Sequence, residues 1–117
     1  KVADFIPELG VNGAEGGKLL VVGWGGTYGH LLSAVQEVRE AGIDVSFAHF
    51  DYIMPLPRNT EKVLGNFDKI LVCELNSGHF VNYLRGVMPQ FKYEQFNKVQ
   101  GQPFLVQEIV GAIKENL

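Results

Sequence analysis

The sequence has little of what would mark several common classes of protein. Among 117 residues there is a single cysteine, Cys73, so the chain cannot form an internal disulfide or supply the four thiolates of a typical iron–sulfur cluster. The ten lysines and arginines are scattered and the net charge is −3, which gives no basic patch for nucleic acid. No apolar run approaches the roughly 20 residues of a membrane helix. We therefore expect a cytoplasmic globular protein that binds neither nucleic acid nor membrane, with Cys73 buried among apolar neighbours.

The first 17 residues lack a regular pattern, and the sequence does not begin with methionine. Four glycines punctuate residues 10–17, while Val2, Phe5, Ile6 and Leu9 supply scattered apolar positions. This composition predicts that residues 1–17 are a linker from a preceding domain or an edge-strand segment, and that residues 18–117 form the domain proper.

The clearest pattern in the chain runs from Lys18 to Gly29, with the sequence KLLVVGWGGTYG. Four consecutive apolar residues indicate a strand buried on both faces, and the glycines that follow are typical of a tight turn into a helix. Beyond the turn, Leu31 to Ala41 repeats apolar residues at helical spacing, and Gly42 is placed to end the helix. This segment predicts the strand–turn–helix opening of an α/β domain.

Further strands and helices alternate along the rest of the sequence. Strands are predicted at Val45–Asp51 and Asp68–Glu74, with a weaker edge strand within Phe91–Val99. Helices are predicted in the ranges 60–67, 80–88 and 106–117, the first of them capped by Asn59 or Thr60. Strands that alternate with helices predict an α/β fold with a mostly parallel sheet.

Three polar or rigid turns follow the predicted strands, namely Trp24–Gly29, Tyr52–Arg58 and Leu75–His79. In a parallel sheet they share the carboxyl end, where α/β proteins bind their ligands and partners. The glycine spacing of the first turn, with Asp51 after the second strand, also outlines a dinucleotide-binding fold. Trp24 stands where the chain would have to approach the phosphates, so a turn packed on a protein surface is the preferred interpretation.

The residues at this end do not assemble into a recognisable catalytic set. Glu74 and His79 could act as an acid–base pair, but a carboxylate at a strand end also caps the next helix in many folds. His30 and His49 have no metal-ligand spacing with other residues. We therefore predict no catalytic residue and no metal ligand, and leave cofactor binding by this chain undetermined.

Three motifs in register resemble the carboxyl-terminal domain of the α subunit of 2-oxoglutarate:ferredoxin oxidoreductases, in the thiamine-diphosphate-dependent 2-oxoacid:acceptor oxidoreductase family. They cover the chain from about Lys18 onward. Gly26 replaces the serine of the family's first motif, and His79 replaces the usual glutamine of the third. The matching residues are Trp24, Gly25, Thr27, Tyr28 and Gly29 in the first motif, Pro55, Leu56 and Pro57 in the second, and Glu74, Asn76 and Gly78 in the third.

The resemblance implies a transketolase carboxyl-terminal-like fold: a three-layer α/β/α sandwich whose five-stranded sheet has one antiparallel edge strand, which the opening segment near Phe5 would supply. It also implies an enzyme that converts a 2-oxoacid and coenzyme A to acyl-CoA and CO₂, with ferredoxin as electron acceptor. Thiamine diphosphate, Mg²⁺ and an iron–sulfur cluster would belong to the full enzyme, with thiamine diphosphate and the cluster held mainly by the partner subunit. This domain alone is expected to bind no cofactor.

Two hypotheses follow from the sequence. In the first, the domain is non-catalytic alone and presents the residues of the three motifs, with His79, to the preceding domain of its own chain and to a β subunit. In the second, it is a free-standing Rossmann-like nucleotide-binding domain.

Overall fold

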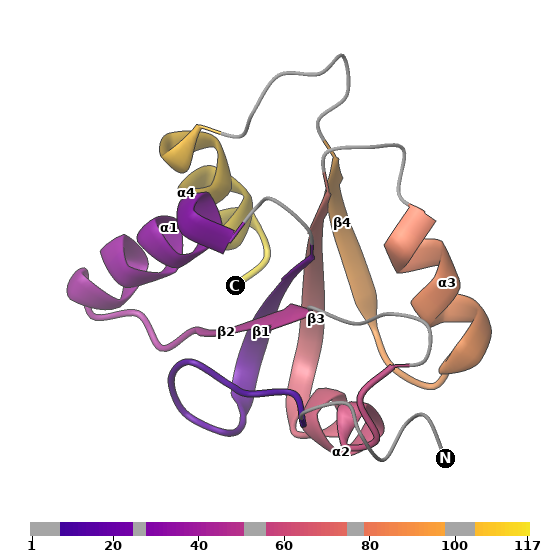
Figure 1. Ribbon diagram of the computed structural model, residues 1–117. Coiled ribbons are helices and arrows are strands. Elements are labelled where there is room, and N and C mark those ends of the chain that lie inside the picture. The colour runs from indigo at the N-terminus through magenta and orange to yellow at the C-terminus, as the bar shows by residue number, and fades with distance from the viewer. Residues whose placement is uncertain (1–7, 25–27, 51–55, 75–78, 98–104) are drawn as a thin grey trace.

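The computed structural model describes residues 8–24, 28–50, 56–74, 79–97 and 105–117, and these ranges contain an alternating α/β chain (Figure 1). Its elements are β1 (Gly17–Trp24), α1 (Tyr28–Glu40), β2 (Ser46–Phe50), α2 (Thr60–Gly65), β3 (Phe67–Glu74), α3 (His79–Val87), β4 (Tyr93–Asn97) and α4 (Val106–Glu115). The strands form one sheet in the order β2-β1-β3-β4, with every neighbouring pair parallel. The predicted α/β fold with a mostly parallel sheet is confirmed.

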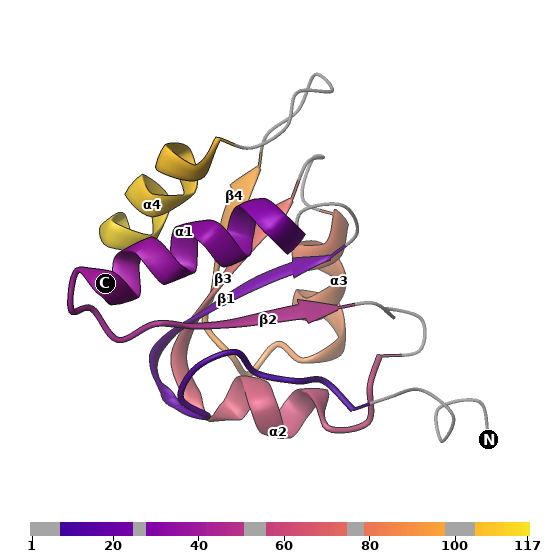
Figure 2. The same ribbon diagram turned by 60° about the vertical axis from the view of Figure 1, so that its left-hand side comes forward.

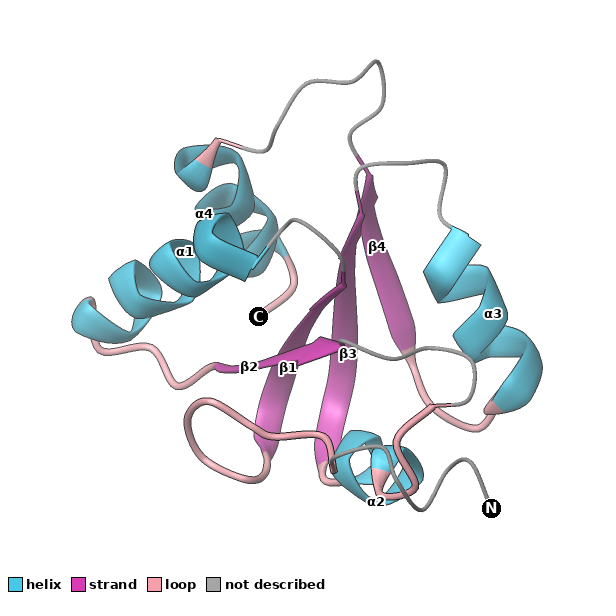
Figure 3. Cartoon of the chain, viewed as in Figure 1, coloured by secondary structure: helices cyan, strands magenta, loops and turns pink. Residues whose placement is uncertain are grey.

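Helices cover both faces of the sheet. Helices α1 and α4 lie side by side on one face, whereas α3 and the short α2 lie on the other (Figures 1 and 2). The cartoon coloured by secondary structure shows the strands enclosed between these two groups of helices (Figure 3). The arrangement is the predicted three-layer sandwich.

The sheet has four strands in the described ranges, where the sequence predicted five. The opening segment does pair antiparallel with the edge of the sheet, but only at a single bridge, in which Asn12 and Phe47 exchange backbone hydrogen bonds of 2.7 and 3.0 Å. Gly13 follows at once with φ of +116°, and this left-handed backbone turns the chain away before a ladder can form. The prediction placed the antiparallel pairing near Phe5, which lies outside the described residues.

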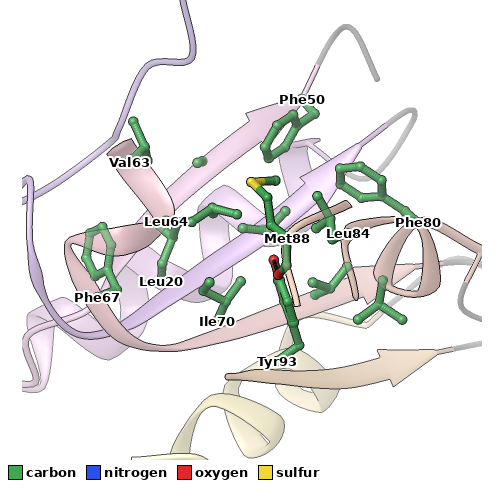
Figure 4. Packing of buried hydrophobic residues seen from close by; sticks show 14 of the residues in the cluster. Leu20, Phe50, Val63, Leu64, Phe67, Ile70, Phe80, Leu84, Met88 and Tyr93 are labelled. Atoms are coloured by element: carbon green, nitrogen blue, oxygen red, sulfur yellow. Dashed lines mark hydrogen bonds between the residues drawn. The ribbon is translucent and has the colours of Figure 1, made fainter. Parts of the chain in front are cut away.

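The four apolar residues of β1 are buried because both faces of this central strand are covered. Leu20 and Val22 point into a core with α2 and α3, whereas Leu19 and Val21 point into a second core with α1 and α4. In the first core, Phe50, Phe80, Leu84 and Met88 lie close together and the hydroxyl of Tyr93 points toward Met88 (Figure 4). That hydroxyl donates a hydrogen bond of 2.9 Å to the Met88 carbonyl oxygen.

Capping residues were predicted for the end of α1 and the start of α2. Gly42, with φ of +89°, ends α1 as predicted: its N–H bonds the Arg39 carbonyl and the Ile43 N–H bonds the Val38 carbonyl, the pattern of a Schellman motif. The predicted side-chain cap of α2 is wrong. The Asn59 amide is instead engaged by the backbone of Leu9, with hydrogen bonds of 2.7 and 2.9 Å, and so fastens the opening segment.

The predicted weak strand exists as β4, at the edge of the sheet beside β3. Tyr93 is buried, whereas the residues that follow it are partly or fully exposed, which explains the broken alternation of its sequence. Among the described helices, none is long and apolar enough to span a bilayer.

Candidate functional site

The candidate site is the carboxyl end of the sheet, which we define by the last residues of the four strands: Trp24, Phe50, Glu74 and Asn97. Because the strands are parallel, these residues share one end, and the register places Trp24 beside Phe50 and Glu74 beside Asn97. The three turns singled out from the sequence follow β1, β2 and β3 along the chain. Of their motif residues, the following lie outside the described ranges: Gly25, Thr27, Pro55, Asn76 and Gly78.

Glu74 is the best-defined polar group at this end. Its side chain is 1% exposed, and its two carboxylate oxygens accept hydrogen bonds from the backbone N–H groups of Phe80 at 2.8 Å and Val81 at 2.9 Å. These amides belong to the first turn of α3, where the helix dipole favours a negative charge. Glu74 therefore caps α3, which is the structural alternative that the sequence left open. His79, the other half of the suggested acid–base pair, begins α3 with an exposed side chain.

Trp24 reaches the same carboxylate from the neighbouring strand. Its indole Nε1 lies 3.4 Å from Glu74 Oε1, a long hydrogen bond, and its ring centroid lies 6.0 Å from that of Phe80. Phe80 in turn meets Phe50 edge to face at 5.0 Å. The half-buried Trp24 ring is thus packed onto the first core of the domain itself. Sequence analysis missed this contact, because 50 residues separate Trp24 from Glu74.

A second group of aromatic side chains surrounds the start of α1. Tyr28 lies 5.2 Å from His49 and 5.8 Å from Phe47, measured between ring centroids. With the backbone around Asn12 these rings line an open hollow of about 560 Å³, and Tyr28 remains 50% exposed. Sequence analysis singled out Tyr28 but missed its grouping with His49 and Phe47, although their spacing in β2 places both on one face of the strand.

The remaining described motif residues have mixed surroundings. Leu56 packs against the first core, and Pro57 is buried, with its carbonyl accepting hydrogen bonds from the N–H and hydroxyl of Thr60. This half of the proline motif therefore fastens the chain to the start of α2. Gly29 lies in the first turn of α1, where an added Cβ would meet no atom within 4 Å, so packing inside the domain does not require glycine there.

The described side chains do not fit a metal cluster. They contain no group of three histidine, cysteine or acidic residues placed to hold a metal ion. Burial, and to a smaller extent the neighbouring Glu74 charge, raises the pKa of the Cys73 thiol to about 12. A buried thiol that stays protonated is a poor ligand for iron, which binds the thiolate.

Asn97 presents one unsatisfied atom at the end of β4. Its Oδ1 is buried and accepts no hydrogen bond from the residues that the structure describes, although Asn97 lies beside the well-satisfied Glu74. A buried carbonyl oxygen without a donor is destabilising. The polar groups at the carboxyl end are thus unequal: Glu74 is satisfied within the domain and Asn97 is not.

Comparison with known proteins relates the chain to one group of enzymes. It is 37% identical over 117 residues to the 2-oxoglutarate oxidoreductase subunit KorA of Mycobacterium tuberculosis. This alignment covers 96% of this chain and 17% of that subunit. It is 28% identical over 105 residues to the α subunit of 2-oxoacid:ferredoxin oxidoreductase 1 of Aeropyrum pernix, covering 86% of this chain and 16% of that subunit. A scan against models of known families finds no match.

Solved structures give the same relationship. The chain superposes with a TM-score of 0.90 and 26% identity on 2-oxoglutarate:ferredoxin oxidoreductase from Magnetococcus marinus, a structure with 2-oxoglutarate, coenzyme A and succinyl-CoA bound; 98% of this chain and 20% of that chain are covered. A split-gene transketolase, described as an inactive β4 tetramer, matches in fold alone, with a TM-score of 0.71 and 15% identity over 92% of this chain and 41% of that one.

These matches confirm the resemblance recognised from the three motifs and favour it over a free-standing nucleotide-binding domain. The chain spans about one sixth of the curated relatives it matches. It is therefore homologous to a segment of the α subunits of 2-oxoacid:ferredoxin oxidoreductases and has a transketolase-like fold.

Proposed function

We propose that this chain is the carboxyl-terminal assembly domain of the α subunit of a thiamine-diphosphate-dependent 2-oxoglutarate:ferredoxin oxidoreductase. The complete enzyme would convert a 2-oxoacid and coenzyme A to acyl-CoA and CO₂ and pass electrons to ferredoxin in the cytoplasm. The observation that carries the proposal is the superposition of 98% of this chain, with a TM-score of 0.90, on part of an enzyme of that activity.

In this proposal the domain provides a docking surface for its neighbours and no catalytic residue. Thiamine diphosphate would supply the carbanion chemistry on the 2-oxoacid, with Mg²⁺ and the iron–sulfur cluster also held outside this chain. Two features of the described residues support that division. The Glu74 carboxylate already accepts two backbone N–H groups of α3, and the Cys73 thiol is buried with its pKa raised to about 12.

The carboxyl end of the sheet is the surface we propose for docking onto the preceding domain of the same subunit and onto the β subunit. Tyr28 exposes half of a large ring there, beside an open hollow lined by other aromatic groups. Aromatic side chains on rigid elements contribute much of the binding energy of protein interfaces. Because α1 and β2 hold the rings of Tyr28, Phe47 and His49 in place, little order would have to be gained on docking.

The direct test is reconstitution of the complete enzyme. The full α subunit, co-purified with its β subunit, should reduce ferredoxin when given 2-oxoglutarate and coenzyme A, and an α subunit without residues 18–117 should fail to assemble. Other 2-oxoacids tested in parallel would define the substrate.

The isolated 117-residue chain provides the complementary test. Calorimetry with thiamine diphosphate, coenzyme A, 2-oxoglutarate and NAD(P) should detect no tight binding, and the chain alone should show no turnover. Turnover by the isolated chain would overturn the assembly role. Micromolar affinity for NAD(P) that is abolished by Gly25→Val would instead support a Rossmann-like nucleotide-binding domain.

A further inference from the structure

We infer that Glu74 is a positioning residue that fixes the end of β1 and the start of α3 relative to each other, so that the two sides of the proposed docking surface form one rigid unit. This inference deepens the proposed function and rests on it for its consequence in assembly. The arrangement itself is a property of the 117-residue chain and can be tested without any partner.

Glu74 is a charged side chain that is removed from water. Among the buried residues that the structure describes, Glu74 is the only acidic or basic side chain; the other buried polar residues are Ser46 and Thr60. Removing a carboxylate from solvent is costly unless hydrogen bonds replace its hydration. Such a residue is therefore expected to hold its partners in a defined geometry.

The hydrogen-bond partners of the Glu74 carboxylate come from two different elements, β1 and α3. The carboxylate is at the end of β3; it accepts the Phe80 and Val81 N–H groups from α3, and the Trp24 indole N–H approaches it from the end of β1. The 3.4 Å contact with Trp24 is the weakest of the three, but the Trp24 ring also rests on Phe80. Glu74 and Phe80 together therefore determine where the Trp24 ring lies.

The residues that Glu74 connects lie on either side of two of the sequence motifs. Trp24 and Tyr28 flank residues 25–27, which carry the first motif, and Glu74 and His79 flank residues 75–78, which carry the third. A common anchor at Glu74 makes the flanks of the two motifs depend on each other. A partner that contacts these flanking residues would then meet a preformed arrangement, at a lower entropic cost than two independent groups.

The substitution Glu74→Gln is the main test because it keeps the size of the side chain and removes one acceptor oxygen and the charge. Its amide NH₂ would face a backbone N–H of α3. We expect hydrogen exchange at the Phe80 and Val81 amides to become at least about tenfold faster, since hydrogen bonds to charged groups contribute more than about 1.4 kcal/mol.

Trp24 provides the readout that separates positioning from stability. It is the only tryptophan of the chain, so its fluorescence reports this position alone. In Glu74→Gln the emission should shift to longer wavelength and become more accessible to quenchers while the chain is still folded by circular dichroism. Glu40→Gln, an exposed residue of α1, should leave emission and exchange unchanged.

A second control lowers stability without touching the carboxylate. Ile113→Ala truncates a buried residue of α4 in the opposite core and should lower the stability of the chain with the native Trp24 emission retained. If Glu74→Gln leaves Trp24 emission unchanged, or if Ile113→Ala shifts it equally, Glu74 contributes only stability and the inference is wrong.

The consequence for assembly is tested with the full α subunit and a double-mutant cycle. Trp24→Phe keeps an aromatic ring against Phe80 and removes the indole N–H. If Glu74 positions Trp24, the combined effect of Trp24→Phe and Glu74→Gln on assembly with the β subunit should be smaller than the product of the two single effects. Independent effects would contradict the coupling. If Glu74→Gln changes the Trp24 emission but all variants assemble with the β subunit as the wild type does, Glu74 positions Trp24 and the proposed docking surface is wrong.

Discussion

The two ends of the sheet are built in different ways. At the amino end the connections are short and held by backbone hydrogen bonds: a single residue, Asn66, joins α2 to β3, and its carbonyl accepts the Gly17 N–H at 3.1 Å. At the carboxyl end, side chains make the connections, with Glu74 and Trp24 as the main examples. The amino end thus has a one-residue connection with a backbone hydrogen bond, whereas at the carboxyl end a buried carboxylate joins neighbouring elements.

The amino end also fastens the termini of the described chain. The Lys69 ammonium donates a hydrogen bond of 3.2 Å to the Asn116 carbonyl, and Arg39, in the last turn of α1, donates to the Val45 carbonyl and to Asn12. These contacts account for local order without using any motif residue. The proposed docking residues belong to the carboxyl end, so substitutions at the two ends should have different consequences.

The largest expected effect is loss of the aromatic packing below the carboxyl end. Phe80→Ala should lower the free energy of unfolding by about 3–5 kcal/mol, because it removes the fully buried ring that contacts both Phe50 and Trp24. Leu117→Ala at the amino end should change it by less than about 0.5 kcal/mol, since Leu117 is half exposed. Urea denaturation measures both. Equal losses would show that the two ends do not differ in the way described.

Stability should fall at alkaline pH because of the buried thiol near the carboxyl end. Burial raises the pKa of Cys73 from 9.0 to about 12 in the native state. The unfolded state therefore loses this proton first, and its deprotonation favours unfolding from pH 9 upward. The free energy of unfolding should therefore fall by about 1.4 kcal/mol per pH unit between pH 9 and 12 from this group alone. Burial raises the pKa of Tyr93 to about 12 as well, which steepens the fall above pH 10.

The substitution Cys73→Ala tests whether the thiol causes this pH dependence. The substitution should remove the part of the pH dependence that begins at pH 9, and the native thiol should resist alkylation at pH 8 until the chain is unfolded. Denaturation midpoints measured at several pH values check the first expectation, and labelling with and without urea checks the second. Rapid alkylation of the native chain would show that Cys73 is accessible.

Arg39→Ala should have a smaller and local effect at the amino end. Loss of the Arg39 hydrogen bonds should weaken the bridge between Asn12 and Phe47 and lower the free energy of unfolding by about 1–2 kcal/mol. Hydrogen exchange should increase at Asn12 and Phe47, whereas the emission of Trp24 should not change. A shift in that emission would indicate that the two ends are coupled.

The smallest expected effect is a gain. Gly111 is exposed in the middle of α4, and a Cβ added there would meet no atom within 4 Å. Gly111→Ala should raise the free energy of unfolding by about 0.5–1 kcal/mol through helix propensity, measured by urea denaturation. Because α4 is not part of the proposed docking surface, assembly of the full subunit should not change. Weaker assembly would extend that surface onto α4.

The sequence predicts the elements of this fold better than it predicts their side-chain contacts. The run Leu19–Val22 identified a strand covered on both faces, and Gly42 correctly ended α1. Both are local signals, set by hydrophobic period and backbone conformation. Among the described residues the sheet has four strands instead of five, because the opening segment pairs there only at Asn12 before Gly13 turns it away.

At the carboxyl end, the direction of the strands could be predicted from the sequence, but the side-chain contacts could not. Strand order and direction bring the motif turns to one end, as the alternating elements implied. The contact between Trp24 and Glu74, and the use of Asn59 to hold Leu9, both join residues 50 positions apart. Periodicity and propensity contain no information on such long-range hydrogen bonds, so no single-sequence pattern could have indicated them.

The most direct test of the account is to compare two residues that are equally exposed at opposite ends of the sheet. Tyr28, 50% exposed, lies at the carboxyl end, and Leu117, 49% exposed, lies at the amino end. Each is replaced by serine in the full α subunit, and the dissociation constant for the β subunit is measured. The account predicts that Tyr28→Ser weakens assembly at least about tenfold, as loss of an aromatic interface residue does, with Leu117→Ser close to wild type. Equal effects, or a larger effect at Leu117, would contradict docking through the carboxyl end.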